Sequence, residues 1–421
     1  MSKSLIYFPR LQGAEKNMWK EYAQLAEEYK PVNLGLGFPD FSPPKFITDA
    51  LSEVLKSNNP YLHQYAKPNG HVRLVNVLAK LYSKLLLREI DPDTEILATL
   101  GASEALFCAV SGLVDQGDEV IIIEPYFDVY VPLIKMAGGT PRFIALKPKP
   151  STNNLSSSAD WSFDVKELES LFNEKTKVII VNTPNNPLGK VFDRSELTLI
   201  ADLCKKWDVV CITDEVYEWM VFKPKEHIRM AGLPGMWERT VTVGSAGKTF
   251  CMTGWKVGWV YGPTRLLRSL QIVHQSAVFS GSTIEQEAVA VAFERELSLL
   301  GQNGSYFKKL EEGLRSKRDF MVKILLDTKM KPVIPDGGIF VIADWSQLES
   351  LVDLNSESDH NKDFRFTKWM VKNIGLQGIP PTVFYNENNK KIIENYVRFC
   401  FIKEEANLVK AQEALNRLKI L

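Results

Sequence analysis

The chain contains few of the residues that stabilise small secreted proteins or bind structural metals. Only five cysteines and five histidines occur among 421 residues. The cysteine count is odd, no Cys-x-x-Cys pair occurs, and the histidines form no His-Glu-x-x-His pattern. These absences disfavour a disulfide framework and a zinc ribbon, so we expect reduced thiols and no bound metal.

Long hydrophobic runs and an excess of one charge are also absent. No apolar stretch approaches the length of a membrane span. The 51 basic residues balance 51 acidic ones, which gives no general attraction to nucleic acid or to acidic membranes. Residues 1–10 lack the apolar core and cleavage site of a signal peptide and are poor in arginine. We expect a cytoplasmic protein without nucleic-acid or membrane partners; a mitochondrial form also fits if the chain is a processed product.

Short valine and isoleucine runs alternate with helical patterns through the middle of the chain. Five of these runs predict buried strands, at residues 96–100, 119–123, 177–181, 209–213 and 240–243. Such an alternation predicts a mainly parallel sheet covered by helices on both faces. Polar motifs follow each run, and parallel sheets bind ligands beyond the carboxyl ends of their strands. We therefore expect one site to collect these motifs.

The pattern changes from about residue 310. A long helical pattern is followed by strand-like runs at 339–342 and 396–401 and by a closing helix, which together predict a separate α+β domain. Two polar, turn-rich stretches, residues 147–158 and 355–363, are interpreted as exposed loops.

Lys248 and Lys256 lie eight residues apart in a turn rich in glycine and serine. Desolvation and a nearby cation lower the pKa of an amine and activate it for imine formation. Residues 247–249 also resemble the end of a nucleotide P-loop, but Thr242 stands where that motif needs glycine. Apolar neighbours disfavour a plain surface turn. We interpret Lys248 as the imine-forming amine and Lys256 as a phosphate-binding cation, which suggests pyridoxal phosphate.

Pyridoxal phosphate needs an acid that keeps its pyridine nitrogen protonated. Asp214 ends an apolar strand, where an unpaired carboxylate is costly, so a cationic partner is expected. The alternative is a helix N-cap. Tyr217 and Asn186 are candidates for holding the phenolate oxygen of the cofactor, although residues 186–189 alone would pass for an ordinary turn.

The phosphate group needs hydrogen-bond donors. Residues Gly101, Ala102 and Ser103 lie between a strand and a helix, where backbone amides bind anions, and Ser245 would complete the site with Lys256. Tyr126 is a candidate for stacking on the pyridine ring, with simple packing as the alternative.

Two further features concern the substrate. Arg398 lies in an apolar run and suits a carboxylate, with an internal salt bridge as the alternative. Residues 35–40 lack the third glycine of a dinucleotide loop and are interpreted as a close backbone turn beside the substrate.

Taken together, these residues resemble the class I aminotransferases of fold type I. Within them, the chain is similar to the branch of kynurenine aminotransferases, glutamine transaminase K and cysteine-S-conjugate β-lyases, from Trp19 to the last helix. The stretches that carry the resemblance are residues 33–40, 118–125, 182–190, 212–217, 234–240, 244–250 and 397–401.

This resemblance implies an α/β fold. We expect a large domain with a mainly parallel seven-stranded sheet between helices, and a smaller α+β domain. The expected bounds are residues 1–45 for an N-terminal arm and part of the small domain, 46–309 for the large domain and 310–421 for the small domain.

The resemblance also implies the roles of the site residues. Lys248 is the imine lysine, Asp214 pairs with the pyridinium, Asn186 and Tyr217 hold the phenolate oxygen, and Arg398 binds the substrate α-carboxylate. Tyr65 would reach the phosphate of a partner subunit, so a homodimer is expected. The substrate-binding set is Trp19, Gly37, Asn186, Phe279 and Arg398.

The implied reaction is a ping-pong transamination between a 2-oxo acid and an L-amino acid of the kynurenine, glutamine, methionine or aromatic type. The alternatives are β-elimination from cysteine conjugates by the same residues and a cofactor-binding protein without turnover. The sequence departs from the branch at Leu36, Ala66, Asn69, Ser103, Tyr126 and Ile339. We expect these changes on the substrate side, with loss of aromatic surface at Ser103 and Ile339 disfavouring kynurenine relative to smaller donors.

Overall fold

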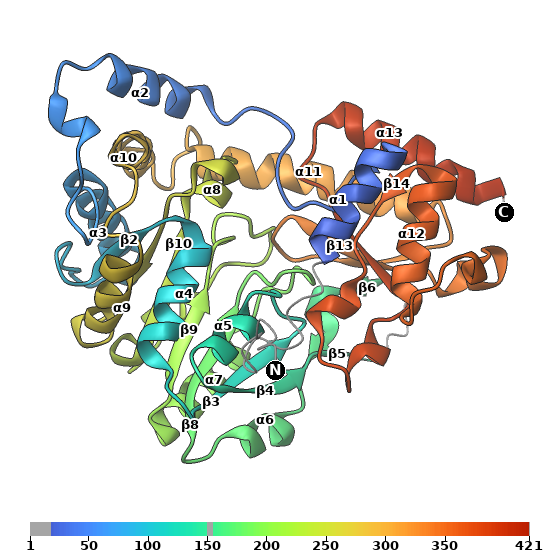
Figure 1. Ribbon diagram of the computed structural model, residues 1–421, viewed down its shortest axis with the longest axis horizontal. Helices are drawn as coiled ribbons and strands as arrows, with labels where there is room; N and C mark the ends of the chain where they lie inside the picture. Colours follow the sequence, from blue (N-terminus) through green and yellow to red (C-terminus); the bar gives the residue numbers. More distant parts are fainter. Residues whose placement is uncertain (1–17, 150–154, 421) are drawn as a thin grey trace, which may run out of the picture.

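A seven-stranded sheet forms the centre of the computed structural model, which describes residues 18–149 and 155–420 (Figure 1). The strands, in their order across the sheet, are β2 (Ile96–Thr99), β11 (Gly258–Tyr261), β10 (Thr240–Ser245), β9 (Val210–Asp214), β8 (Thr176–Asn182), β3 (Glu119–Glu124) and β4 (Thr140–Ala145). Strand β11 is antiparallel to both of its neighbours, and the other pairings are parallel. The predicted mainly parallel seven-stranded sheet is confirmed.

Helices cover both faces of this sheet, which explains the apolar runs in its inner strands. Along β8, Val178 and Ile180 belong to the core cluster that contains α4 (Gly101–Leu113), α5 (Tyr130–Met136) and α9 (Thr264–Ala277). Ile179 and Val181, which alternate with them, pack with α6 (Val165–Leu171) and α7 (Arg194–Trp207) on the opposite face. Successive side chains of a strand point to opposite faces, so burial of both faces requires a continuous apolar run.

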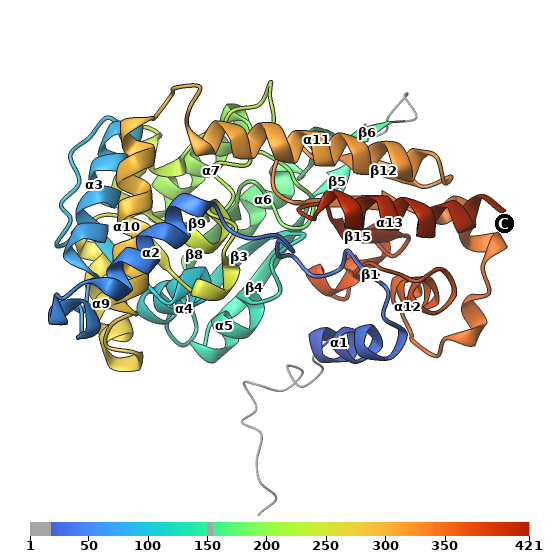
Figure 2. The same cartoon turned by 90° about the horizontal axis from the view of Figure 1, so that it is seen from above.

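The end of the sheet that carries β2 is covered by helices from distant parts of the chain. Helices α3 (Val72–Leu86) and α10 (Thr283–Ser298) pack together there, and α2 (Lys45–Lys56) lies on α10. The segment between α1 (Met18–Tyr29) and α2 crosses the molecule from the side that carries the C-terminal helices (Figure 2).

The second region is built on a four-stranded sheet with the order β15 (Tyr396–Cys400), β13 (Phe340–Asp344), β12 (Lys331–Ile334) and β6 (Ser156–Ser157). Its helices are α1 (Met18–Tyr29), α11 (Tyr306–Leu326), α12 (Lys362–Ile374) and α13 (Glu405–Asn416). Strand β1 (Val32–Asn33) pairs with β14 (Leu376–Gln377), so the first described residues join the C-terminal part of the chain. In Figure 2, α11 runs along the top of the molecule into this region.

The two regions are interwoven. Strand β6 precedes most of the large sheet in sequence but pairs with β12 of the small sheet. A further two-stranded pairing joins β5 (Lys147–Pro148) to β7 (Trp161–Ser162). The domain bounds expected from the sequence stay a prediction.

Both predicted exposed loops are partly wrong. Ser158 is fully buried, and its hydroxyl donates to the Gly189 carbonyl and accepts from the Asp336 amide. Asp363 is fully buried in the first turn of α12, where its carboxylate accepts the backbone amide and the hydroxyl of Thr382. These polar side chains are buried because they form hydrogen bonds with buried backbone groups. A polar residue in the sequence can therefore be either exposed or buried, and the sequence alone does not tell which. Residues 150–154 of the first loop lie outside the described residues, as do residues 1–10.

Within the described ranges, no helix has both the length and the apolar character needed to cross a membrane. The cysteines are Cys108, Cys204, Cys211, Cys251 and Cys400; all are free and buried.

Candidate active site

A cavity of about 230 Å³ opens at the carboxyl ends of the parallel strands. It collects every site residue predicted from the sequence except Tyr65, Tyr126 and Phe279. Its walls consist of Trp19, Gly37, Gly101, Ala102, Ser103, Leu106, Phe127, Asn182, Asn186, Asp214, Val216, Tyr217, Ser245, Gly247, Lys248, Thr253, Lys256, Val257, Phe340 and Arg398.

Lys248 lies on the short helix α8 (Ala246–Thr249), which follows directly after strand β10. The Ser245 hydroxyl caps this helix by accepting the Lys248 amide at 3.3 Å. The Lys248 Nζ donates to the Gly37 carbonyl at 3.2 Å. Burial lowers the pKa of the Lys248 amine, and the positive charges of Arg398 and Lys256 lower it further. The lowered pKa increases the share of the neutral amine, which is the nucleophilic form.

Asp214 is buried at the end of β9. Its Oδ2 accepts the Tyr130 hydroxyl at 2.6 Å, and its Oδ1 accepts the Val216 amide at 3.4 Å. Burial raises the pKa of this carboxyl. A turn, not a helix, follows Asp214, so the N-cap interpretation is wrong. A cation placed against this carboxylate would stabilise its ionised form, and a protonated ring nitrogen would be such a cation.

The turn that starts α4 forms a compact cradle. Gly101 has φ +74°, which favours glycine, and a Cβ on Gly101 would lie 3.4 Å from the Lys256 Nζ. A Cβ on Gly258 of β11 would lie 2.5 Å from the Gly101 carbonyl carbon, so the two backbones touch. The first amides of a 13-residue helix, the Ser245 hydroxyl and the Lys256 ammonium thus face one space, a donor set that fits a phosphate.

Arg398 is buried, yet no carboxylate of residues 18–149 and 155–420 accepts its hydrogen bonds. Its Nη2 donates to the Gly35 carbonyl at 2.8 Å and its Nη1 to the Asn186 Oδ1 at 3.3 Å, while Nε is buried without a partner in the same part of the chain. Burial lowers the pKa of the guanidinium to about 10. A buried donor without a partner costs about 1–3 kcal/mol, so this cation is suited to an incoming anion. The salt-bridge alternative is not supported.

Aromatic rings surround this guanidinium. Its Cζ lies 4.2 Å from the centre of the Phe340 ring, 5.0 Å from Phe384 and 5.7 Å from Trp19. Trp19 itself is held by a hydrogen bond of 2.7 Å from its Nε1 to the Asp128 Oδ2. Neither Phe384 nor Asp128 was singled out by the sequence.

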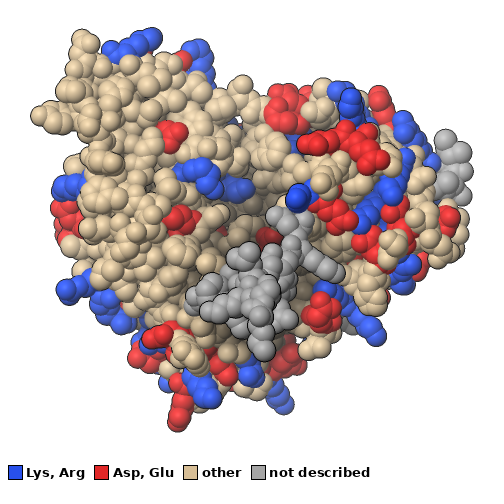
Figure 3. Space-filling view, in the orientation of Figure 1, with Lys and Arg blue, Asp and Glu red and all other residues tan. Residues whose placement is uncertain are grey.

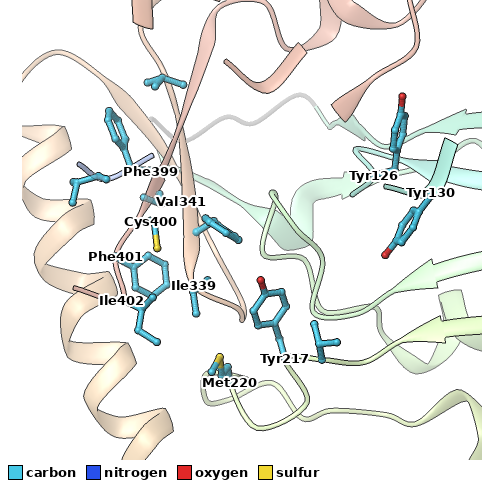
Figure 4. Close-up of a cluster of buried hydrophobic side chains, with 14 of the residues drawn as sticks. Tyr126, Tyr130, Tyr217, Met220, Ile339, Val341, Phe399, Cys400, Phe401 and Ile402 are labelled. Carbon is cyan, nitrogen blue, oxygen red and sulfur yellow. The ribbon is translucent and has the colours of Figure 1, made fainter. Parts of the chain in front are cut away.

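Tyr126 does not reach the cavity, contrary to the expected ring stacking. Its ring packs against Phe143 with 5.8 Å between centroids, and the next residue, Phe127, lines the cavity instead. Figure 4 shows Tyr126 pointing away from Tyr217. Of these two neighbouring aromatic residues, Phe127 is therefore the one placed to contact a ligand in the cavity.

Ile339 also lies outside the cavity. It is buried in the hydrophobic cluster beside Phe401 and Ile402, and the neighbouring Phe340 lines the cavity (Figure 4). Asn69 donates to the carbonyls of Pro92 and Asp93, away from the site. Leu36 is not among the lining residues either. The expectation that the departures cluster around the substrate is therefore wrong for these positions, and Ser103 is the one among them that lines the cavity.

Tyr65 and Phe279 lie together on the surface. The Tyr65 side chain is 84% exposed, and its ring meets that of Phe279 edge to face at 5.3 Å. Neither lines the cavity of its own chain.

A buried polar cluster behind the cradle was not predicted. The Glu104 carboxylate accepts hydrogen bonds from the Leu100 amide and the Cys108 thiol, and its Oε1 lies 2.8 Å from the His274 Nδ1. The i,i+4 spacing of Glu104 and Cys108 was the available signal, but His274 lies 170 residues away in sequence. One potential metal-ligand atom from each of these three side chains lies within 4.8 Å of the others, and the hydrogen bonds among them use these atoms.

Comparison with known proteins agrees with this geometry. The sequence model of the family Aminotransferase class I and II matches residues 29–415. Kynurenine–oxoglutarate transaminase 1 of Rattus norvegicus is 49% identical over 98% of both chains. Kynurenine–oxoglutarate transaminase 3 of Homo sapiens is 47% identical over 99% of this chain and 91% of its own length.

Solved structures give the same result. Bna3p of Saccharomyces cerevisiae superposes with a TM-score of 0.90 at 34% identity over 97% of each chain. YbdL of Escherichia coli, described as having a methionine aminotransferase function, gives a TM-score of 0.86 at 30% identity over 98% of this chain and all of its own.

Proposed function

Since this chain belongs to the class I and II aminotransferases, which transfer amino groups between amino acids and 2-oxo acids with pyridoxal 5'-phosphate, we propose that its amino donors are neutral L-amino acids, kynurenine among them. The observation that carries this proposal is the distribution of charge in the cavity. Of the described residues that line it, the cationic ones are Lys248, Lys256 and Arg398.

Each of these three cations has a proposed role in binding or chemistry. Lys248 supplies the amine, and Lys256 lies against the Gly101 cradle that fits the phosphate. Arg398 has an unpartnered Nε and suits the α-carboxylate. The described part of this chain leaves no cation in the cavity for a carboxylate on the donor side chain. The surfaces nearest Arg398 are the rings of Trp19 and Phe340, which favour an apolar or aromatic side chain.

The cofactor, when bound, supplies an aldehyde that condenses with amines and a ring that accepts electrons from the substrate α-carbon. Lys248 would then move the α-proton, since burial lowers the pKa of its amine and the side chain lines the cavity. Asp214 would hold a proton on the ring nitrogen, with Tyr130 fixing the orientation of the carboxylate. Tyr217 and Asn186 would bind the phenolate oxygen, and Phe127 would lie against the ring.

The test is a single-turnover reaction of the cofactor-loaded enzyme with a panel of donors, followed in the cofactor absorbance. Kynurenine, glutamine, methionine and phenylalanine should react with higher kcat/KM than aspartate and glutamate. Faster reaction with the acidic donors would refute the proposal.

We also propose that the enzyme is a homodimer in which Tyr65 completes the phosphate site of the partner subunit. Tyr65 and Phe279 are large apolar side chains exposed on one surface, and Tyr61, which precedes Tyr65 by one turn of chain, is 78% exposed. Figure 3 shows fewer charged side chains on the left-hand part of the molecule, which carries α2 and α3, than on the right. An exposed apolar surface of this kind is typical of an interface.

Mixing two inactive variants tests this arrangement. A dimer of Lys248→Ala and Tyr65→Ala chains would contain one site with a native lysine and a native tyrosine. Activity should therefore reappear after the two variants are unfolded and refolded together. A mixture no more active than its components, or a monomer by light scattering, would contradict the proposal.

A further inference from the structure

The segment between strand β3 and helix α5, residues 124–128, contacts both structures that flank Arg398. We propose that Asp128 and Glu124 are positioning residues for the substrate carboxylate: Asp128 fixes Trp19, and Glu124 fixes the loop that carries Phe384. This inference rests on the proposed role of Arg398 as the carboxylate-binding residue.

Asp128 connects this segment to the N-terminal helix. Its Oδ2 accepts the Trp19 Nε1 at 2.7 Å, across 109 residues of sequence. Trp19 lies in the first turn of α1, a helix that otherwise packs on α12 of the second region. The hydrogen bond therefore spans the two regions and sets where the indole ring lies. That ring lines the cavity and faces the Arg398 guanidinium at 5.7 Å.

Glu124 makes the second connection. It is fully buried, and both of its carboxylate oxygens accept hydrogen bonds from one loop: Asn386 donates its backbone amide and its Nδ2 (2.8 Å), and Asn389 donates its Nδ2 (2.5 Å). Two residues along, the Tyr126 amide donates to the Phe384 carbonyl at 3.0 Å. Phe384 ends the 3₁₀ turn Pro381–Phe384, is fully buried, and packs on the Arg398 guanidinium at 5.0 Å.

The consequence for Arg398 is orientational. Its two Nη donors are fixed by Gly35 and Asn186, and its Cζ lies over the rings of Phe340 and Phe384. The 124–128 segment holds Trp19 and Phe384, two of the three rings around it. Rings packed against a guanidinium restrict how far it can turn, and two-point binding of a carboxylate needs its fork in one orientation. Loosening either ring should therefore weaken carboxylate binding without affecting the cofactor, because a displacement of about 1 Å is enough to lose much of an oriented interaction.

A double-mutant cycle on the cofactor-loaded enzyme tests the Asp128 part. The readout is the dissociation constant of 3-phenylpropionate, a carboxylate without an amino group, measured by calorimetry, beside the dissociation constant of pyridoxal phosphate. Asp128→Ala and Trp19→Phe should each weaken 3-phenylpropionate about tenfold, and the double variant should be no weaker than either alone. Asp128→Asn, whose amide oxygen still accepts from the indole, should bind like the native enzyme. Additive effects, or an equal loss of cofactor affinity, would overturn the proposal.

Glu124→Gln tests the other connection, because the new amide places a donor against the asparagine donors of the loop. Glu387→Gln is the matched control: Glu387 lies on the same loop with its side chain 84% exposed, paired with Lys390. We expect Glu124→Gln to raise the dissociation constant of 3-phenylpropionate about tenfold and Glu387→Gln to leave it unchanged. Unchanged binding of 3-phenylpropionate in Glu124→Gln would refute the positioning role of Glu124. If this variant does not fold, the Asp128 cycle decides whether the 124–128 segment positions the rings beside Arg398.

Arg398→Lys separates this inference from the function on which it rests. If that variant binds 3-phenylpropionate as well as the native enzyme, the assignment of Arg398 itself fails. If it loses binding but the Asp128 and Glu124 variants do not, Arg398 keeps its role and only the positioning inference fails.

Discussion

The two sides of the cavity are built in different ways. The cofactor side comes from neighbouring strand ends of one sheet: Asp214 ends β9, Ser245 ends β10, and Asp214 lies in register with Asn182 of β8 and Val243 of β10. The substrate side combines Trp19, Gly37, Phe340 and Arg398, which come from distant parts of the chain. The first side is therefore fixed by the register of a single sheet, whereas the second depends on how two regions pack together.

This difference predicts how each side responds to mutation. Changes on the cofactor side should act on chemistry and leave the fold intact, because the strands hold the backbone. Changes on the substrate side should act on affinity and selectivity, because they alter the fit between two regions.

The largest effect is expected for Lys248. Lys248→Ala should keep the fold but lose turnover by several orders of magnitude, because both the amine and the proton carrier are removed; a general acid or base alone supplies roughly 10²–10⁴-fold. Steady-state kinetics on the purified variant, with circular dichroism as the folding control, measure this. Near-native activity would show that another amine serves the reaction.

Asp214→Asn should come next, with a single-turnover rate reduced by about 100-fold, the scale of losing one preorganised electrostatic group. The amide cannot hold a positive ring nitrogen as the carboxylate does, although Tyr130 can still donate to its oxygen. The rate should fall much more than substrate affinity does. A change in affinity alone would reduce Asp214 to a structural residue.

Arg398→Lys tests the substrate side. The charge remains, but the planar fork is lost, so kcat/KM should fall roughly 10–100-fold for every amino donor while cofactor affinity stays constant. Parallel titrations with cofactor and with several donors distinguish the two effects. A loss confined to acidic donors would move Arg398 to a side-chain subsite.

The same contrast explains what the sequence could and could not predict. Lys248, Asp214 and the Gly101 turn were predictable because each follows a recognisable strand, and parallel strands end at one edge. Two expected cavity residues, one on each side, differ from the structure by one position: Phe127 lines the cavity rather than Tyr126, and Phe340 rather than Ile339. Adjacent residues of an extended chain point to opposite sides, so a shift of one position exchanges core and cavity. The hydrogen bond between Trp19 and Asp128 joins residues 109 positions apart, so no local sequence pattern predicts it.

The smallest expected effect concerns Ser103, which lines the cavity and stands where the resemblance leads us to expect an aromatic residue. One aromatic contact is worth about 0.5–1.5 kcal/mol beyond its area burial, so Ser103→Tyr should raise kcat/KM for kynurenine and phenylalanine by up to roughly tenfold relative to glutamine and methionine. Ile339→Tyr is the contrasting variant: that side chain is buried in the core, so overpacking should lower stability by about 1–3 kcal/mol without a selective gain. Donor selectivity and thermal unfolding of both variants measure these outcomes. If Ile339→Tyr gained aromatic selectivity, or if Ser103→Tyr gained none, the assignment of substrate selectivity to the Ser103 side of the cavity would be wrong.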